Sequence, residues 1–230
     1  MASTGKPGPV AHTNQREFIE LCKKTGDVVI VDKQVDWDLE LGAISRRATE
    51  IDGPAVAFTN IKDYPGQGIF VNPISTWRRA AITLGLEPHA TVPEIYAEYI
   101  RRDSNPIEPV MVKDAAHRDV IIKGDDVDIT KLVAPMIHYG DGGRYFGTWC
   151  MAVSMDPDTG WVNWGTYRFM VHNNRYLSGW PFKPSHFGHM LTTKYLPYNK
   201  PMPIAKPPFY AAWSTPILHD TLTGLRPDTN

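Results

Sequence analysis

The chain has 230 residues, of which 42% are hydrophobic and 21% are charged, a composition typical of a globular protein. Its 24 basic and 25 acidic residues give a formal net charge of −1, which argues against nucleic-acid binding because no excess of positive charge is present. Two cysteines are too few for a disulfide framework or a cysteine zinc site, and the absence of a long apolar run or secretory signal predicts a soluble, cytoplasmic protein with no membrane partner.

The first half of the chain alternates between helical and strand patterns, after a small, polar stretch over residues 1–14 that is predicted to form a flexible tail. Gly26 is expected to end the first helix, Asp36 or Asp38 to cap the second, and Thr91 to cap the last. Apolar spacing predicts helices over 15–24, 39–48, 77–84 and 93–101, and strands over 28–31, 55–58 and 69–71. This order favours a small α/β domain over residues 15–108.

The second half is richer in strand-like and aromatic residues. Long strands are predicted over 144–155 and 161–172. They are joined by a hairpin turn over residues 156–160, in which Pro157 fixes φ and Gly160 accepts a positive φ. We therefore expect a second domain over residues 109–205 and a divergent tail over residues 206–230.

Candidate functional side chains gather between residues 161 and 189. Arg168 is a fixed cation whose planar fork of donors suits a carboxylate or a phosphate. Asn163 and His186 can both offer uncharged ligand atoms to a divalent metal. His186 and His189, three residues apart, could share one face of a helix, although such a pair is more often only polar surface.

A geometric condition applies to this site. Asn163 and Arg168 are five residues apart, so a regular strand would direct them to opposite faces. They can share a site only if Gly165 marks a bulge or a break in the ladder, and we predict that irregularity.

Several of these features also have purely structural interpretations. An arginine in a strand is more often solvated or ion-paired than bound to a substrate. The run from Asp141 to Arg144 could form an anion-binding nest of backbone amides, but it is more often a plain turn. The aromatic stripe is more typical of a core than of a cofactor site, and its members are Trp149, Trp161, Trp164, Tyr167 and Phe169.

Taken together, a series of motifs gives the chain a family resemblance. In chain order they read VDWDLELGAISRRA, GPAVAFTNI, DITKLVAPMIHYGDGGRYFGT, DPDTGWVNWGTYR, SHFGHM and PMPIA. Over about residues 15–205 the chain resembles the N-terminal half of the UbiD family of reversible decarboxylases, which use prenylated FMN. The resemblance implies an α+β protein, with an N-terminal α/β module followed by an incomplete split β-barrel flavin-binding domain.

The resemblance also implies roles for individual residues. Asn163 and His186 match ligands of a Mn²⁺ ion that bridges to the cofactor phosphate, and the backbone carbonyl of Trp164 matches a ligand of a neighbouring K⁺ ion. The backbone of Thr166, Tyr167 and Arg168 would lie along the flavin. Arg168 would hold the substrate carboxylate, and Ser185 stands where the family places a cofactor-contacting residue.

The implied reaction is the non-oxidative decarboxylation of an aromatic acid, of hydroxybenzoate type, or of an α,β-unsaturated acid. The implied partners are that small-molecule acid, a flavin prenyltransferase that supplies the cofactor, and further copies of the chain in a homo-oligomer. The prenylated flavin would serve as the electron sink for the carbanion that the loss of CO₂ leaves behind.

The sequence departs from the family in its carboxylates. The family completes its site with three glutamates, whereas the last glutamate of this chain is Glu108, and only Asp220 and Asp228 lie in the tail. Three interpretations follow: a decarboxylase subunit whose missing half comes from another chain, a truncated member that is inactive, or a protein that binds a flavin or a partner without catalysis.

Overall fold

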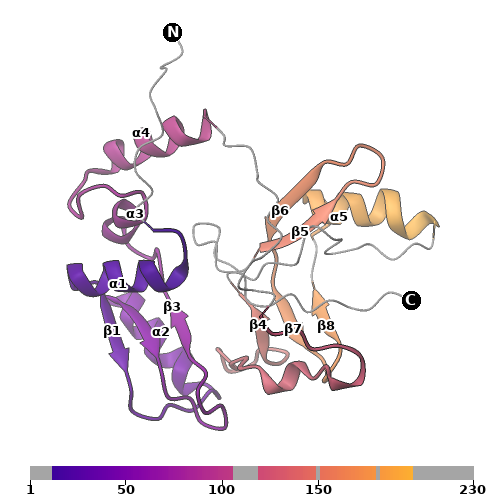
Figure 1. The fold of residues 1–230 in the computed structure, drawn as a ribbon, viewed down its shortest axis with the longest axis horizontal. Helices are drawn as coiled ribbons and strands as arrows, with labels where there is room; N and C mark the ends of the chain where they lie inside the picture. The colour runs from indigo at the N-terminus through magenta and orange to yellow at the C-terminus, as the bar shows by residue number, and fades with distance from the viewer. Residues whose placement is uncertain (1–11, 106–118, 149–150, 180–181, 199–230) are drawn as a thin grey trace. The chain divides into compact units, whose positions relative to one another are not determined.

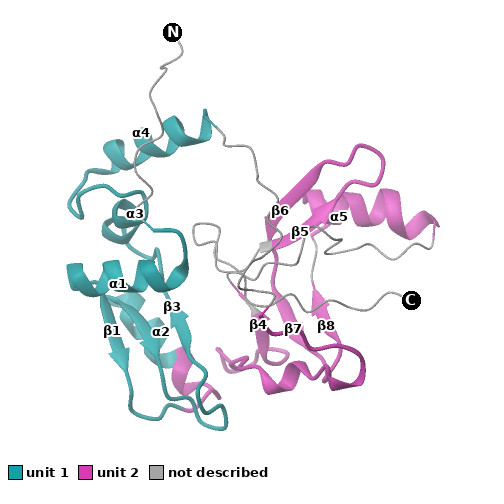
Figure 2. Ribbon diagram, viewed as in Figure 1, with its two compact units in different colours: residues 1–35, 43–110 teal, residues 36–42, 111–230 magenta. Residues whose placement is uncertain are grey.

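The computed structural model describes residues 12–105, 119–148, 151–179 and 182–198, and the chain divides into two compact units (Figures 1 and 2). Unit 1 comprises residues 1–35 and 43–110, and unit 2 comprises residues 36–42 and 111–230. Each unit is described by itself.

All seven elements that the sequence predicts in the first half of the chain are present. They are α1 (Gln15–Thr25), β1 (Val28–Val31), α2 (Glu40–Glu50), β2 (Ala55–Phe58), β3 (Ile69–Val71), α3 (Trp77–Thr83) and α4 (Val92–Asp103). The strands form one sheet in the order β1-β2-β3, in which β1 and β2 run parallel and β3 runs antiparallel to β2.

Local sequence signals explain where the helices begin and end. The Asn14 side chain accepts the Glu17 N–H at 2.9 Å at the start of α1, and Gly26, with φ 74°, terminates the helix in the left-handed conformation. Thr91 and Glu94 form a capping box at the start of α4, as the sequence predicts. Ahead of α2 the Asp36 carboxylate accepts the N–H of Asp38 at 3.0 Å.

The core of unit 1 forms around β2, whose four residues are all buried. A strand that is covered on both faces needs a continuous apolar run, and AVAF supplies one. Phe18 and Cys22 of α1 are also buried, and the ring of Phe18 meets the ring of Phe70 edge-on at 6.1 Å. Apolar burial of this kind is the main source of stability for such a unit.

Unit 2 holds two sheets and a helical segment. Its strands are β4 (Tyr145–Gly147), β5 (Met151–Met155), β6 (Val162–Thr166), β7 (Phe169–Val171) and β8 (Leu177–Gly179). One sheet has the order β4-β7-β8, and β5 pairs with β6 as an antiparallel hairpin. The helical segment comprises α5 (His186–Met190), the π-helix η4 (Leu191–Tyr195) and the short η5 (Leu196–Tyr198), and two 3₁₀ turns, η2 (Gly124–Asp126) and η3 (Ile129–Lys131), precede the strands.

The two long strands predicted in the second half are each divided. Residues 144–155 contribute to two different sheets as β4 and β5, and residues 161–172 divide into β6 and β7. The hairpin turn between β5 and β6 is confirmed, and Gly160 has φ 73°. The described strands of unit 2 lie in two separate sheets, so the split barrel stays a prediction.

The irregularity predicted at Gly165 is wrong in its position. Gly165 pairs with Ala152 within an unbroken ladder, and the strand ends only after Thr166. The chain leaves this ladder at Tyr167 and Arg168 because Phe169 begins a new pairing with β4 and β8. The interruption between Asn163 and Arg168 therefore exists, but a change of sheet produces it rather than a bulge at the glycine.

Residues 36–42 belong to unit 2 because they pair with the segment ahead of β4. The Met136 N–H donates to the Trp37 carbonyl at 3.1 Å, and the Leu39 N–H donates to the Met136 carbonyl at 2.9 Å. The Arg144 guanidinium lies 4.3 Å from the centre of the Trp37 ring and donates to the Ala134 carbonyl at 2.7 Å. Arg144 therefore stabilises the packing of this segment.

Candidate functional site

The strand β6 directs one set of side chains toward the start of α5, which lies alongside the β5–β6 hairpin (Figure 1). In extended backbone every second side chain points to the same side, so Asn163 and Gly165 of β6 share a side with the flanking residues Trp161 and Tyr167. The Trp161 ring meets the His186 ring edge-on, with centroids 5.0 Å apart. The Tyr167 ring lies 5.0 Å from the ring of Phe187. Asn163, which lies between these two contacts, therefore faces the first turn of α5.

Asn163 is buried, with 4% of its surface exposed. It pairs across the hairpin with Ser154, which is also buried, and its Nδ2 donates to Ser154 Oγ at 3.4 Å. This assignment of the amide leaves Oδ1 as the atom that can act as a ligand.

His186 is the first residue of α5, and its side chain is exposed. The preceding residue, Ser185, caps the helix: its hydroxyl accepts the Gly188 N–H at 3.1 Å and donates to the Phe182 carbonyl at 2.6 Å. Capping accounts for a serine at this position without a cofactor. His189 is also exposed.

The pair formed by Asn163 and His186 fits a divalent metal in part. An amide oxygen and a neutral imidazole can fill two coordination positions. Within the described residues, however, no three histidine, cysteine, aspartate or glutamate side chains gather in a group that could hold a metal. A manganese ion here would need a carboxylate ligand from elsewhere, since Mn²⁺ favours oxygen ligands.

Arg168 lies in the two-residue connection between β6 and β7, and its side chain is exposed. Within the part of the chain that the structure describes, its guanidinium makes no ion pair or hydrogen bond. It is therefore available to an anionic ligand. Thr166 is exposed as well.

The aromatic stripe is only partly core. Phe169 is buried, as predicted, but Trp161 and Trp164 are each 48% exposed, so the prediction is wrong for these two. Their strand β6 has only β5 as a hydrogen-bonded neighbour among the described strands, so little covers the outer ring surfaces. Trp149 lies outside the described residues.

Two contacts of the hairpin with the helical segment are missed by sequence reasoning. The phenolic oxygen of Tyr167 accepts the Phe187 N–H at 3.1 Å. At the turn, Lys194 Nζ lies 2.8 Å from Asp156 Oδ2 and 2.9 Å from Asp158 Oδ2, and its hydrogen bond holds the pKa of Asp156 down at about 2. No local signal identifies these partners, because they lie 20 and 38 residues apart in the chain.

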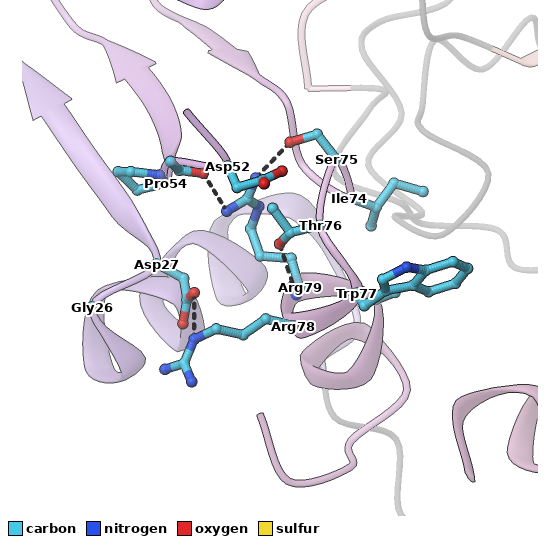
Figure 3. A pocket seen from close by; sticks show the side chains of 12 residues that line it. Gly26, Asp27, Asp52, Pro54, Ile74, Ser75, Thr76, Trp77, Arg78 and Arg79 are labelled. Carbon is cyan, nitrogen blue, oxygen red and sulfur yellow. Dashed lines mark hydrogen bonds and ion pairs between the residues drawn. The ribbon is translucent and has the colours of Figure 1, made fainter. Parts of the chain in front are cut away.

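A pocket with a volume of about 870 Å³ lies elsewhere, among residues of unit 1 (Figure 3). The side chains of Arg78 and Asp27 form an ion pair at 2.7 Å across it. The buried Arg79 donates to the Gly53 carbonyl at 3.0 Å and to Ser75 Oγ at 2.5 Å. Both cations of this pocket therefore have partners within the unit.

Two further observations concern the buried cysteine of α1 and the character of the helices. Burial raises the pKa of the Cys22 thiol to about 12, so this cysteine is not a nucleophile at neutral pH. None of the helices in the described ranges combines the length and the apolar character that crossing a membrane requires.

Two sequence-family models match most of the chain. Residues 19–99 match the 3-octaprenyl-4-hydroxybenzoate carboxy-lyase N-terminal domain, and residues 110–206 match the Rift-related domain of the same carboxy-lyase. The second match contains Asn163, Arg168 and His186.

Named relatives agree with this match. Ferulic acid decarboxylase 1 of Candida dubliniensis is 33% identical over 192 residues, which cover 74% of this chain and 37% of the relative. The closed form of vanillic acid decarboxylase from Sedimentibacter hydroxybenzoicus is 26% identical with a TM-score of 0.78, over 83% of this chain and 41% of that one. The chain spans less than half the length of the curated relatives described by these comparisons.

A second structure shows the same fold with a cofactor bound. It is an evolved dimeric form of the UbiD-class enzyme HmfF from Pelotomaculum thermopropionicum in complex with prFMN, with a TM-score of 0.70 and 22% identity over 83% of this chain and 43% of that one.

Proposed function

Because this chain belongs to the UbiD family of carboxy-lyases, we propose that it forms part of a prenylated-FMN-dependent decarboxylase. Its substrate would be an aromatic acid of hydroxybenzoate type or an α,β-unsaturated acid. The observation that supports this most directly is that Trp161 and Tyr167, which lie on either side of Asn163, contact His186 and Phe187 at the start of α5, within the matched Rift-related region. The catalysed change is the reversible, non-oxidative loss of CO₂.

The proposed cofactor site uses backbone and neutral side chains. Asn163 Oδ1 and the His186 imidazole would hold Mn²⁺, and the Trp164 carbonyl would hold K⁺. Ser185 and the backbone of residues 166–168 would contact the flavin. Bound prenylated FMN supplies the electron sink for the carbanion that decarboxylation leaves.

Arg168 would bind the substrate. A guanidinium fork can donate to both oxygens of a carboxylate, which orients the bond that is to break. The exposure of Arg168 and the absence of an ion pair within the described residues leave its donors available for this role. Proton transfer needs additional carboxylates, and no glutamate follows Glu108.

A second candidate function rests on that departure. The chain would retain part of the metal and flavin site without catalysis, or would complete its site with carboxylates supplied by a different polypeptide in a larger assembly. Both alternatives predict binding, and only the second predicts turnover.

Co-expression with a flavin prenyltransferase tests the cofactor proposal. We expect the purified 230-residue chain to retain prenylated FMN, seen in its ultraviolet–visible spectrum and by mass spectrometry. CO₂ release from hydroxybenzoates and cinnamates would then separate an active chain from a binding protein. A protein that is folded and colourless after this co-expression would contradict the proposal.

Manganese titration tests the metal pair. The wild-type chain should bind Mn²⁺, followed by the electron paramagnetic resonance of the free ion. His186→Ala should abolish that binding because it removes one of two identified ligands. His189→Ala is the matched control, since His189 lies on the same short helix, and it should bind as the wild type does. Equal binding by all three proteins would exclude this site.

A further inference from the structure

The side chain of Tyr167 links the strand that carries Asn163 to the helix that begins with His186. Its phenolic oxygen accepts the Phe187 N–H at 3.1 Å, and its ring packs on the Phe187 ring at 5.0 Å. The N–H groups of the first helical turn have no partner within the helix, so this bond satisfies one of them. Ser185 satisfies a second through the Gly188 N–H.

Gly165 leaves the space in which the Tyr167 ring lies. A Cβ atom at position 165 would stand 2.4 Å from Cε2 of that ring, which is far closer than any tolerated contact. Glycine at this position is therefore explained by the approach of the tyrosine, since the ladder around it is regular. The two residues together fix where the ring, and hence the hydroxyl, lies relative to β6.

We propose that Tyr167 is a positioning residue whose hydroxyl fixes the start of α5, and with it His186, relative to the strand that carries Asn163. His186 and Phe187 are consecutive, so a bond to the Phe187 N–H fixes the backbone from which the imidazole projects. His186 also meets the edge-on ring of Trp161, a contact that sets a distance but supplies no hydrogen bond between the rings. This inference deepens the proposed metal site and rests on it for its functional meaning.

The expected effect of losing this bond is an effect on metal binding. Removing a group that hydrogen-bonds to a metal ligand and orients it typically lowers metal affinity by roughly 10- to 100-fold. Tyr167 acts one residue away from the ligand, so we expect the lower end of that range.

The experiment compares three variants of the full chain. Tyr167→Phe removes the hydroxyl and keeps the ring. Gly165→Ala displaces the ring and keeps the hydroxyl. Tyr195→Phe is the matched control, because the Tyr195 hydroxyl also joins the helical segment to the same hairpin, donating to the Met155 carbonyl at 2.8 Å.

The first readout needs no metal. In a histidine-labelled chain at pH 8, the ring current of Trp161 displaces the His186 ring resonances, which are assigned by their loss in His186→Ala. Tyr167→Phe and Gly165→Ala should move these resonances toward the position of an exposed histidine, and Tyr195→Phe should leave them in place. Unchanged His186 resonances in both of the first two variants, or an equal change in all three, would overturn the proposal.

The second readout is Mn²⁺ affinity. Tyr167→Phe should weaken it by about tenfold and Tyr195→Phe by less than about twofold. If the resonances move as expected while the wild-type chain binds no Mn²⁺, the metal site fails and the positioning role stands. If His186→Ala abolishes Mn²⁺ binding while Tyr167→Phe leaves both affinity and resonances unchanged, the positioning role fails and the metal site stands.

Discussion

The environments of four arginines distinguish structural roles from a candidate functional one. Arg79 is buried and donates to the Asn72 and Gly53 carbonyls, and Arg144 packs on Trp37. Arg175 pairs with Asp125 at 2.9 Å. Arg168 differs from them, because within the described residues no protein group engages its exposed guanidinium. An exposed cation without a protein partner, next to a candidate cofactor strand, is a reasonable carboxylate ligand.

Arg168→Gln should weaken the binding of 4-hydroxybenzoate by roughly tenfold or more, because one charge-assisted interaction contributes about 1.5–3 kcal/mol. The measurement is equilibrium binding to the chain isolated after co-expression with the flavin prenyltransferase.

Arg175→Gln serves as the control, since it removes the same charge from the same unit at a site already paired with Asp125. Identical affinities for Arg168→Gln and the wild type would show that Arg168 does not hold the carboxylate.

At the scale of elements, the β5–β6 hairpin and the segment α5–η4 are joined at both ends. Tyr167 binds the first turn of α5, and Lys194 and Tyr195 bind the turn end of the hairpin. The face of the hairpin that carries Asn163 is thereby covered by residues far along the chain. The stability of this pairing is therefore coupled to the geometry of the candidate site.

The Asp156–Lys194 pair should make this pairing sensitive to acid. The hydrogen bond from Lys194 lowers the pKa of Asp156 from 3.8 to about 2. A lowered carboxyl pKa stabilises the folded state above the unfolded value of 3.8, and that contribution is lost as the pH falls through about 2. Hydrogen exchange of the hairpin amides should therefore accelerate as the pH falls from 4 toward 2, after correction for the intrinsic exchange rate.

Asp156→Asn isolates this effect, because it keeps an oxygen that can accept the Asp158 and Thr159 N–H groups of the turn. The variant should show little of the acid dependence that the wild type shows. The same dependence in both proteins would assign the acid sensitivity to other groups.

Gly160→Ala should destabilise the hairpin by about 1–2 kcal/mol, which is the cost of placing a Cβ in the left-handed region. Gly160 has φ 73° and no atom stands within 4 Å of the added Cβ, so backbone strain is the only expected term. Gly142→Ala is the control, because that glycine is not in the left-handed region and its Cβ would make an ordinary 3.4 Å contact. Equal thermal stability of the two variants would contradict the assignment of the destabilisation to backbone strain at Gly160.

At the scale of the whole molecule, exposed apolar side chains are numerous. Trp161 and Trp164 project from β6, and Val29 and Ile30 are exposed on β1, which is an edge of the sheet formed by the described strands. Exposed aromatic groups and an unpaired strand edge favour association.

We therefore expect the chain to self-associate. Sedimentation velocity should show a weight-average coefficient that rises with protein concentration, and Trp164→Ser should reduce that rise because it removes an exposed apolar side chain. A concentration-independent monomer would contradict this expectation.

The sequence by itself determined the elements of unit 1, because its helices and strands carry local signals: Gly26 at a helix end, the Thr91–Glu94 box and the apolar run of β2. It also determined the family, because the motifs from Val35 to Ala205 occur in a characteristic order. Only the tertiary structure decided where the second-half strands divide, since β6 pairs with β5 whereas β7 pairs with β4 and β8.

The same holds for the candidate site. Asn163 and His186 are suggested as ligands by residue type alone, but the sequence cannot show that the residues on either side of Asn163 contact the start of α5, nor that Tyr167 joins the strand to the helix. Strand exchange and side-chain contact depend on pairing between distant segments. Those pairings depend on the packing of the whole unit, so the local sequence pattern does not predict them.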